Sequence, residues 1–360
     1  MEKSTIIRED IENIYGRNLP WDRLKNCTVL ITGAYGMLAS YVMYLLLYLN
    51  EYHNMGIHII AAVRSREKFV QRFGESEEDN LVTIYTEPLE APIFVEETVD
   101  YIIHAASFAS PQYYAKCPVD VIKPNALGTY QLLKLAVEKK SKGFLFFSTG
   151  DVYGQVNQTG SICEDTLGVL DPLDIHSCYG ESKRLAETMC YAYYKQYGVP
   201  TKMLRLWHTY APTMDIENDP RVFASFMNNL VHGEDIVMKS DGSACRAFCY
   251  VADAVAAFFT VLFCGKNGEA YNICNPSEFC SIKQLADRIV SLREDISLKV
   301  ITKERPLDDN YTENLRANLN PPSDEKLRQL GWHPEYTIEQ GFSRVYSYWK
   351  EKNASYCKNL

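Results

Sequence analysis

The 360-residue sequence has no long hydrophobic run, and its longest apolar stretch spans only residues 41–49. A membrane-spanning helix needs about 20 predominantly apolar residues. The first ten residues also lack the apolar core of a signal peptide. We therefore expect a cytoplasmic protein that does not enter a membrane.

Closely spaced cysteines are also missing. The 11 cysteines are scattered, odd in number and contain no CxxC pair. A zinc site or a disulfide framework needs closer or paired spacing. We therefore expect reduced thiols and no metal site.

Basic runs are absent from a chain whose 37 Lys and Arg face 46 Asp and Glu, for a net charge of -9. Nucleic acids and anionic membranes attract surfaces with clustered Lys and Arg. The charge balance therefore predicts neither as a partner.

Short apolar segments alternate with helix-like segments in the first two hundred residues. Strand-like runs occupy 27–32, 57–63, 81–85, 100–104, 143–147 and 202–207, and helix-like segments occupy 37–50, 126–140 and 179–196. This alternation predicts an α/β fold, a Rossmann-type doubly wound parallel sheet covered by helices on both faces.

The pattern loosens after about residue 210, where Pro, Asp, Asn and Gly become frequent. Helices are still expected at 222–232, 251–263, 282–292 and 338–350. We expect a dinucleotide-binding domain over 1–210, which includes a Tyr/Lys helix. A smaller substrate-binding lobe should occupy mainly 211–360, with some elements returning to the sheet.

A glycine-containing turn, Gly33-Ala-Tyr35-Gly36-Met37, follows the first strand and precedes the first helix. Glycine permits unusual dihedral angles and a close backbone approach to a pyrophosphate, and the helix N-terminus offers free N–H groups. The strand before it and the helix after it supply the context of a dinucleotide site. A tight structural turn is the alternative.

Arg64 follows the second strand, where an acidic residue normally binds the ribose of NAD. Its guanidinium could stack on adenine or meet the 2′-phosphate of NADP, or it could face solvent. The residues alone leave NAD and NADP open.

Tyr179 and Lys183 are four residues apart, so a helix places them on one face. An ammonium beside a phenol favours the phenolate, and the sequence therefore predicts Tyr179 as a general base. Ser148 and Thr149 end another strand of the predicted sheet, at the edge where such sheets bind ligands. Either hydroxyl could bind the group that Tyr179 deprotonates, or the pair could cap a helix.

Four motifs occur in one order: Gly33xxGly36xxAla39, His104-Ala105-Ala106-Ser107, Ser148-Thr149 and Tyr179xxxLys183. Together they resemble the extended short-chain dehydrogenase/reductase superfamily over residues 26–350, in its branch of nucleotide-sugar epimerases, dehydratases and decarboxylases. Segments 106–113, 177–187, 218–222 and 246–251 are most similar to UDP-glucuronate decarboxylases (UDP-xylose synthases).

The resemblance implies that Tyr179 takes a proton from the sugar 4-hydroxyl, that Lys183 holds Tyr179 and the nicotinamide ribose, and that hydride passes from C4 to NAD or NADP. NAD is favoured by the family and NADP by Arg64. The expected cofactor-binding residues are Gly33, Tyr35, Gly36, Met37, Arg64, Ala105, Ala106, Ser107, Asn125, Tyr179 and Lys183. The expected substrate-binding residues are Ser110, Asp151, His208, Arg221, Arg246 and Arg316.

Gly150 and Asp151 bear on the reaction. Dehydratases of the family carry an Asp-Glu pair at these positions, and Gly150 cannot act as an acid. Decarboxylases carry Glu where Asp151 stands, and a displacement of about 1 Å can change a rate about 10²-fold. Asp151 is therefore a catalytic candidate with a shortened side chain.

Three further positions depart from the decarboxylase pattern. His176 replaces an Arg, His208 replaces an Asn and Thr213 replaces an Arg. All three are expected in or near the substrate pocket, so a different sugar or nucleobase remains open.

We expect an enzyme that acts on a nucleotide-diphosphate sugar, with UDP-glucuronate decarboxylation as the first interpretation. A 4-epimerase comes next, followed by a 4,6-dehydratase or 4-ketoreductase. A non-catalytic NADP(H)-binding sensor is the alternative from another class, although a sensor would not need Tyr179, Lys183 and Ser148-Thr149 together. The family resemblance also implies a homodimer.

Overall fold

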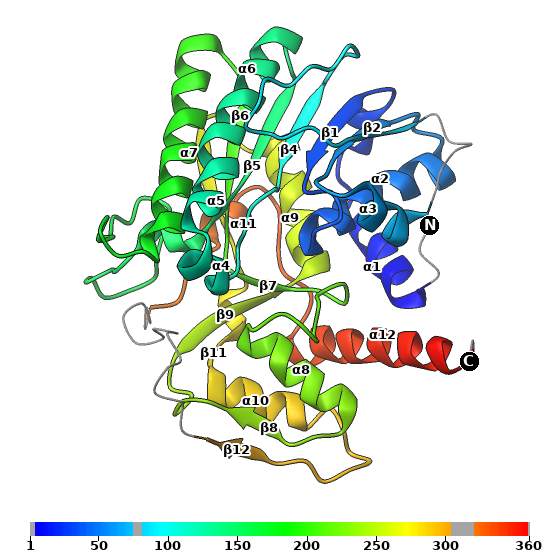
Figure 1. Ribbon diagram of the computed structural model, residues 1–360, viewed down its shortest axis with the longest axis vertical. Coiled ribbons are helices and arrows are strands. Elements are labelled where there is room, and N and C mark those ends of the chain that lie inside the picture. The colour runs from blue at the N-terminus through cyan, green and yellow to red at the C-terminus, as the bar shows by residue number, and fades with distance from the viewer. Residues whose placement is uncertain (1–3, 75–80, 304–319, 359–360) are drawn as a thin grey trace.

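The computed structural model describes residues 4–74, 81–303 and 320–358. Seven parallel strands form the large sheet, in the order β10-β6-β5-β4-β1-β2-β3 (Figure 1). Their bounds are β1 (Thr28–Thr32), β2 (His58–Ala62), β3 (Val82–Tyr85), β4 (Tyr101–His104), β5 (Gly143–Thr149), β6 (Thr201–Leu206) and β10 (Glu269–Ile273). The doubly wound parallel sheet is thus confirmed, and β10 returns to it from the second half of the chain.

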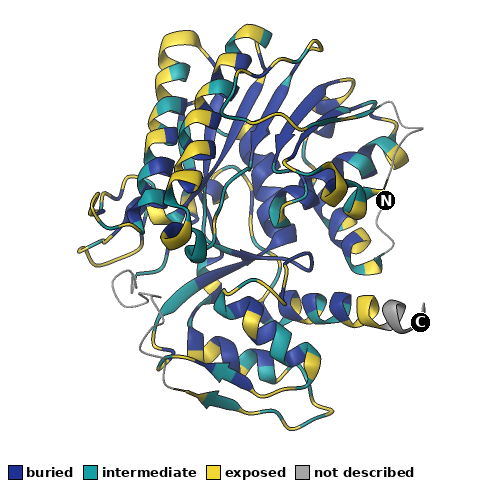
Figure 2. Cartoon of the chain, viewed as in Figure 1, coloured by how far each residue is buried: buried dark blue, intermediate teal, exposed yellow. Residues whose placement is uncertain are grey.

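Helices cover both faces of this sheet because its buried strands carry apolar residues on both sides. Val29 and Ile31 of β1 pack into the cluster that contains α2 (Met37–His53) and α9 (Val251–Cys264). Leu30, between them, belongs to the cluster on the opposite face, with α6 (Thr129–Lys139) and α7 (Ser177–Tyr197). Figure 2 shows the resulting pattern, with buried strands inside and the exposed sides of the helices outside.

Further elements lie beyond the carboxyl ends of the strands (Figure 1). They are a sheet of β7 (His208–Tyr210), β9 (Cys245–Tyr250) and β11 (Phe279–Ser281), a pair of β8 (Ile236–Met238) and β12 (Val300–Thr302), and helices α8 (Val222–His232), α10 (Ile282–Val290) and α12 (Ile338–Lys358). The short helix α11 (Glu325–Arg328) instead packs against β10 of the large sheet. The helices expected in this half are present. A domain boundary near residue 210 stays a prediction.

Several short helices and turns lie along the chain between β2 and α7, among the longer elements of that segment. They are α3 (Arg66–Phe73), α4 (Pro111–Lys116), α5 (Pro118–Lys123), the π-helical turn η2 (Pro124–Gly128) and the 3₁₀ turn η3 (Gly150–Tyr153). Elsewhere 3₁₀ turns occur at η1 (Trp21–Leu24) and η4 (Pro276–Glu278). Of these, α4, α5, η2 and η3 lie near the ends of β4 and β5 and shape the site described below.

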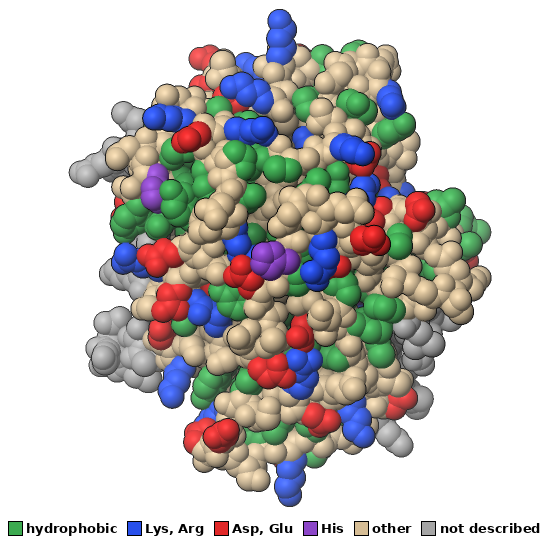
Figure 3. All heavy atoms as spheres, turned by 180° about the vertical axis from the view of Figure 1, so that it is seen from behind, with side chains coloured by type: hydrophobic (Ala, Val, Ile, Leu, Met, Phe, Trp, Pro, Cys, Tyr) green, Lys and Arg blue, Asp and Glu red, His purple; other side chains and the backbone are tan. Residues whose placement is uncertain are grey.

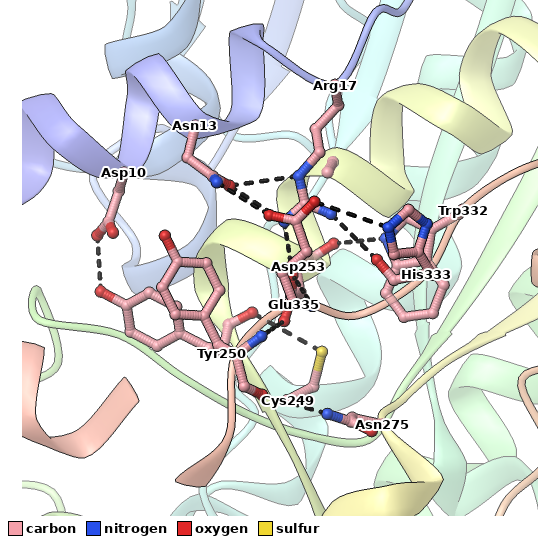
Figure 4. Close-up of polar contacts among 12 residues, drawn as sticks. Asp10, Asn13, Arg17, Cys249, Tyr250, Asp253, Asn275, Trp332, His333 and Glu335 are labelled. Carbon is pink, nitrogen blue, oxygen red and sulfur yellow. Dashed lines mark hydrogen bonds and ion pairs between the residues drawn. The ribbon is translucent and has the colours of Figure 1, made fainter. Parts of the chain in front are cut away.

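The first helix, α1 (Thr5–Tyr15), is an element that the sequence did not predict. Asp10 on this helix is buried and accepts hydrogen bonds from Tyr41, Tyr250 and Arg344 at 2.7–2.8 Å. Figure 4 shows Asp10 and Tyr250 beside a second cluster, in which Arg17 donates to Asp253 at 2.7 Å. Polar contacts therefore join the N-terminal helix to elements from the far end of the chain.

The described surface carries mixed charge. On the face that Figure 3 draws, Lys and Arg side chains lie interspersed with acidic ones. Among the described residues, no helix is both long and apolar enough to cross a membrane, and no cluster of His, Cys, Asp or Glu has the composition of a metal site.

Candidate functional site

The glycine turn lies at the carboxyl end of β1 and has the shape that a dinucleotide needs. Gly33 adopts a positive φ of 67°, and a Cβ there would lie 3.0 Å from the Cα of Ala106. Only glycine allows this close approach of two loops. Helix α2 starts directly after Gly36, so its first N–H groups and its dipole point toward the same edge of the sheet. Gly33, Gly36 and Met37 therefore fit the pyrophosphate of NAD or NADP.

The segment after β4 is fixed by Thr32 and His104. Thr32 Oγ1 accepts the N–H groups of Ala105 and Ala106 at 3.1 and 3.0 Å. His104 Nε2 lies 3.2 Å from the Pro124 carbonyl, which can only accept, so this nitrogen donates and Nδ1 accepts from the Thr32 hydroxyl at 2.8 Å. Burial lowers the pKa of His104 to about 3. His104 therefore braces the strand end as a neutral ring.

Two expected cofactor residues occupy different environments at this edge. Arg64 is exposed, and its guanidinium stacks 4.2 Å from the ring centroid of Phe108. Asn125 is fully buried, and its amide donates to Val121 and Ser182 while it accepts from Ser107 at 2.9 Å. Asn125 therefore acts on the site through Ser107, whereas Arg64 stands at the surface.

Tyr179 lies in the first turn of α7, with its ring stacked on Tyr114 at 5.1 Å between centroids. The side chains of Thr149 and Ser107 hydrogen-bond to it and lower its pKa. Burial and the charge of Asp151 outweigh these bonds and raise the pKa above its usual value. The expectation that Tyr179 has a lowered pKa is therefore wrong for the protein alone, because desolvation dominates.

Lys183 is buried one helical turn beyond Tyr179. Its Nζ donates to the carbonyl of Phe147 at 2.6 Å and lies 5.7 Å from the centroid of the Tyr179 ring. Burial lowers the pKa of Lys183 to about 7, and the carboxylate of Glu187 acts in the opposite direction. The predicted pair is thus brought together on one face of α7, with the lysine held by the end of β5.

Ser148 and Thr149 have separate roles. Ser148 Oγ donates to Glu187 Oε1 at 2.5 Å, and Arg205 binds the same carboxylate through Nε and Nη2. Thr149 Oγ1 caps η3 by accepting the N–H of Asp151 at 3.2 Å and also bonds Tyr179. Thr149 is therefore the hydroxyl that accompanies Tyr179.

A cavity of about 320 Å³ opens beside Tyr179. Its lining includes Met37, Ser148, Thr149, Gly150, Asp151, His176, Tyr179, Trp207, His208, Arg221, Cys245 and Arg246. Most of the expected catalytic and substrate residues thus surround one space, which brings the Tyr179 phenol, a carboxylate and two arginines together.

The arginines place positive charge in this cavity. Arg221 forms a bidentate pair with Asp219 at 2.5–2.8 Å, and Arg246 Nη1 donates to the Cys245 carbonyl at 2.8 Å. Burial, followed by Arg246 and Arg221, holds the pKa of His208 well below its usual value. His208 is therefore neutral and can offer hydrogen bonds to a ligand but no charge.

Two other substrate candidates complete the comparison with the sequence. The Ser110 hydroxyl is buried with no hydrogen-bond partner in the described part of the chain, and its neighbours Ala109 and Pro111 line the cavity. Arg316 lies outside the described residues.

Sequence reasoning missed three residues of the site. Tyr114 stacks on Tyr179, Glu187 binds Ser148, and Trp207 covers Gly150. The spacing of Tyr179, Lys183 and Glu187 at i, i+4 and i+8 was a usable signal for Glu187. Tyr114 and Trp207 gave none, because their partners are distant in sequence.

Comparisons with known proteins identify the family of the chain. The model of the NAD dependent epimerase/dehydratase family matches residues 29–274. UDP-glucuronic acid decarboxylase 6 of Arabidopsis thaliana is 32% identical over 88% of this chain and 87% of its own length. UDP-glucuronic acid decarboxylase 3 of the same plant is 31% identical over similar shares.

Solved structures share the fold. A UDP-glucose 4-epimerase from Thermotoga maritima has a TM-score of 0.75 at 23% identity, over 91% of this chain and 99% of that one. A UDP-glucuronic acid 4-epimerase from Bacillus cereus, solved with UDP-glucuronic acid and NAD, has a TM-score of 0.72 at 21% identity, over 90% and 99%.

The turn at Gly33, the Tyr179–Lys183 pair and the family match over more than half of the chain lead to one conclusion. The chain belongs to the NAD dependent epimerase/dehydratase family, whose members are nucleotide-sugar-modifying enzymes.

Proposed function

We propose that this enzyme decarboxylates a UDP-glucuronate-like nucleotide sugar after transient oxidation at C4. The observation that carries the proposal is the cavity in which Tyr179, Thr149 and Asp151 lie with Arg221 and Arg246. Similarity to relatives named UDP-glucuronic acid decarboxylase supports the choice of substrate.

The residues at the sheet edge fit a dinucleotide. Gly33, Gly36 and Met37 would hold the pyrophosphate, while Ala106 and Ser107 would lie beside the nicotinamide half. Bound NAD would supply a hydride acceptor for the sugar C4 and would return the hydride to C4 at the end, so that the cofactor is not consumed. Similarity to an NAD-dependent family favours NAD, and Arg64 leaves NADP as the alternative.

Tyr179 is the group that takes the proton of the sugar 4-hydroxyl. Thr149 and Ser107 hydrogen-bond to it and stabilise its phenolate. The buried amino group of Lys183 lies 5.7 Å from the centroid of the ring, and its protonated form adds positive charge on that side. Tyr179 later returns the proton to O4, so it ends the cycle as it began.

The C4 ketone makes a C6 carboxylate a β-keto acid, which loses CO₂ as the C5–C6 bond breaks. The electron pair of that bond stays on the sugar, and C5 then takes up a proton. Asp151 lines the cavity beside Tyr179 and is the carboxylic group best placed to position the sugar or carry that proton.

A 4-epimerase is the second candidate, and Gly150 favours it over a dehydratase. Gly150 supplies no acid for loss of water, while epimerisation needs Tyr179, rotation of the ketosugar and return of the hydride from the cofactor to the opposite face of C4. The fold is shared with 4-epimerases, which is compatible with this reaction.

The nucleotide would extend from the arginines into a second cavity of about 320 Å³. Asp219 lines this cavity, and its partner Arg221 lines the first. We propose that Arg221 and Arg246 bind the diphosphate and that the base enters between Phe226 and Lys239.

We also propose a homodimer formed through α6 and α7. These helices pack side by side on one face of the sheet, and Tyr130, Leu185 and Tyr191 are exposed on them (Figure 1). Light scattering after size exclusion should give twice the chain mass, and Leu185→Glu should give the monomer. Leu173→Glu is the matched control, because Leu173 is exposed in the loop before α7.

The reaction is tested by NMR of the purified protein with NAD or NADP and a panel of UDP-, dTDP-, CDP- and GDP-sugars. Release of CO₂ with a pentose product supports decarboxylation. A C4 epimer of the substrate supports the second candidate. Bound nucleotide with no conversion of any sugar would favour the sensor instead.

A further inference from the structure

Trp207 stands at the junction of β6 and β7 and forms part of the wall of the first cavity. Gly150 and Asp151 lie on the same wall, directly after Thr149. Because Thr149 bonds Tyr179, this wall belongs to the reacting end of the cavity.

The indole of Trp207 covers Gly150 closely. A Cβ at Gly150 would lie 3.1 Å from Cδ2 and 3.2 Å from Cε2 of the indole. Most Cβ contacts are longer, so a side chain at position 150 would have to displace the ring. The indole therefore packs so closely on Gly150 that a side chain there would force it to shift by a few tenths of an ångström.

The indole is held from behind by a buried amide. Trp207 Nε1 donates to Asn272 Oδ1 at 3.2 Å, and Tyr153 donates to the same oxygen at 2.7 Å. The Tyr153 and Trp207 rings stack at 5.9 Å with 28° between their planes. Asn272 also donates to the carbonyls of Ile162 and Ser323, which fixes its own orientation.

We propose that Trp207, packed on Gly150 and anchored by Asn272, is a specificity-determining residue that limits the size of the sugar at the reacting end. The proposal rests on the proposed function, since it assumes that a nucleotide sugar enters the cavity. A rigid wall rejects bulk that a flexible one would accommodate, because moving it breaks the bond to Asn272.

Calorimetry with the NAD-loaded enzyme tests the wall. UDP, UDP-xylose, UDP-glucose, UDP-glucuronate and UDP-N-acetylglucosamine differ in the bulk of the sugar. Trp207→Phe and Trp207→Ala should reduce the spread of Kd values among the sugars at least tenfold and leave the Kd of UDP within twofold. An unchanged spread in folded variants would overturn the proposal.

Fluorescence gives a second readout, because Trp207 lines the cavity and Trp21, Trp332 and Trp349 are buried. UDP-sugars should change the emission beyond the change with UDP. Trp207→Phe should lose that difference, and the control Trp349→Phe should keep it. If calorimetry detects binding of the UDP-sugars but the emission changes no more than with UDP, the proposal on Trp207 is overturned while the proposed function stands. If neither UDP nor any UDP-sugar binds, the proposed function fails with it.

A double-mutant cycle isolates the contact between the two residues. Gly150→Ala should weaken binding of the preferred sugar at least tenfold in the wild-type background, since the methyl group pushes the indole. In the Trp207→Ala background, Gly150→Ala should weaken binding of the same sugar less than threefold. Equal losses in both backgrounds would show that the indole does not act through Gly150.

Discussion

Ser148 donates a 2.5 Å hydrogen bond to Glu187, two helical turns beyond Tyr179 on α7. This bond commits the Ser148 hydroxyl proton to the carboxylate that Arg205 also binds. The neighbouring Thr149 is left as the hydroxyl partner of Tyr179. The two hydroxyls of the Ser-Thr pair therefore have different partners, Glu187 for Ser148 and Tyr179 for Thr149, and we expect only Thr149 to assist the chemistry.

Thr149→Ala should lower kcat about 10²-fold, because it removes a hydrogen bond to the general base. Ser148→Ala should lower kcat less than tenfold but reduce the free energy of unfolding by about 1–3 kcal/mol, since Glu187 loses a buried donor. Steady-state kinetics and thermal unfolding of both variants check this. A lower kcat for Ser148→Ala than for Thr149→Ala would contradict the assignment.

Tyr179→Phe should lower kcat by about 10²–10⁴-fold or more, which is the range that general-base catalysis contributes. The ring remains on Tyr114, so NAD binding and thermal stability should stay near the wild-type values. Turnover and calorimetric titration with NAD are the two measurements. Normal turnover would refute the role of Tyr179.

Asp151→Asn should slow decarboxylation at least 10²-fold and slow epimerisation less than tenfold. Asp151→Glu is the matched variant, since it restores the longer side chain that decarboxylases of the family carry. Product formation by NMR separates the reactions. An unchanged rate in Asp151→Asn would mean that Asp151 has no chemical role.

Arg64→Ala should weaken NADP binding at least tenfold more than NAD binding if the guanidinium meets a 2′-phosphate. Its exposed position over Phe108 makes the substitution harmless to the fold. Binding constants for both cofactors provide the comparison, with Arg66→Ala as the neighbouring control. Equal losses for NAD and NADP would exclude that contact.

Lys183→Met should change how stability depends on pH. The folded-state pKa of Lys183 is about 7, below the ordinary value of 10.5. Between these values the unfolded chain holds a proton that the folded chain has lost, so the titration stabilises the wild type as pH rises. Urea unfolding at pH 7, 8 and 9 should show that the free energy of unfolding of the wild type increases relative to that of Lys183→Met as the pH rises. A constant difference would show that Lys183 keeps its proton.

The sequence predicts the parts of this fold that depend on local pattern. The strands of the first two hundred residues and their helices follow from apolar runs, and Tyr179 with Lys183 follows from helical spacing. Helix α1 escaped prediction although Ile7, Ile11 and Ile14 are spaced as on one helix face. Its buried Asp10 is paired with Tyr250 and Arg344, which lie hundreds of residues away, as well as with the nearer Tyr41.

For the site, the sequence predicts which residues meet but not the contacts that each of them makes. Which residues meet at the cavity follows from the order of the motifs, because strand ends converge at one edge. The direction of Ser148 depends on Glu187, 39 residues later, and the cover over Gly150 depends on Trp207. The raised pKa of Tyr179 arises from burial, which spacing does not reveal.

The bond between Asp10 and Arg344 spans 334 residues. A ribosome adding about 5–20 residues per second needs roughly 17–67 s to make that interval. Throughout it, the first helix carries a carboxylate whose guanidinium partner does not yet exist. The Asp10 carboxylate therefore lacks its charged partner until the last helix has been made, whereas Tyr41, its other early hydrogen-bond donor, is synthesised soon after it.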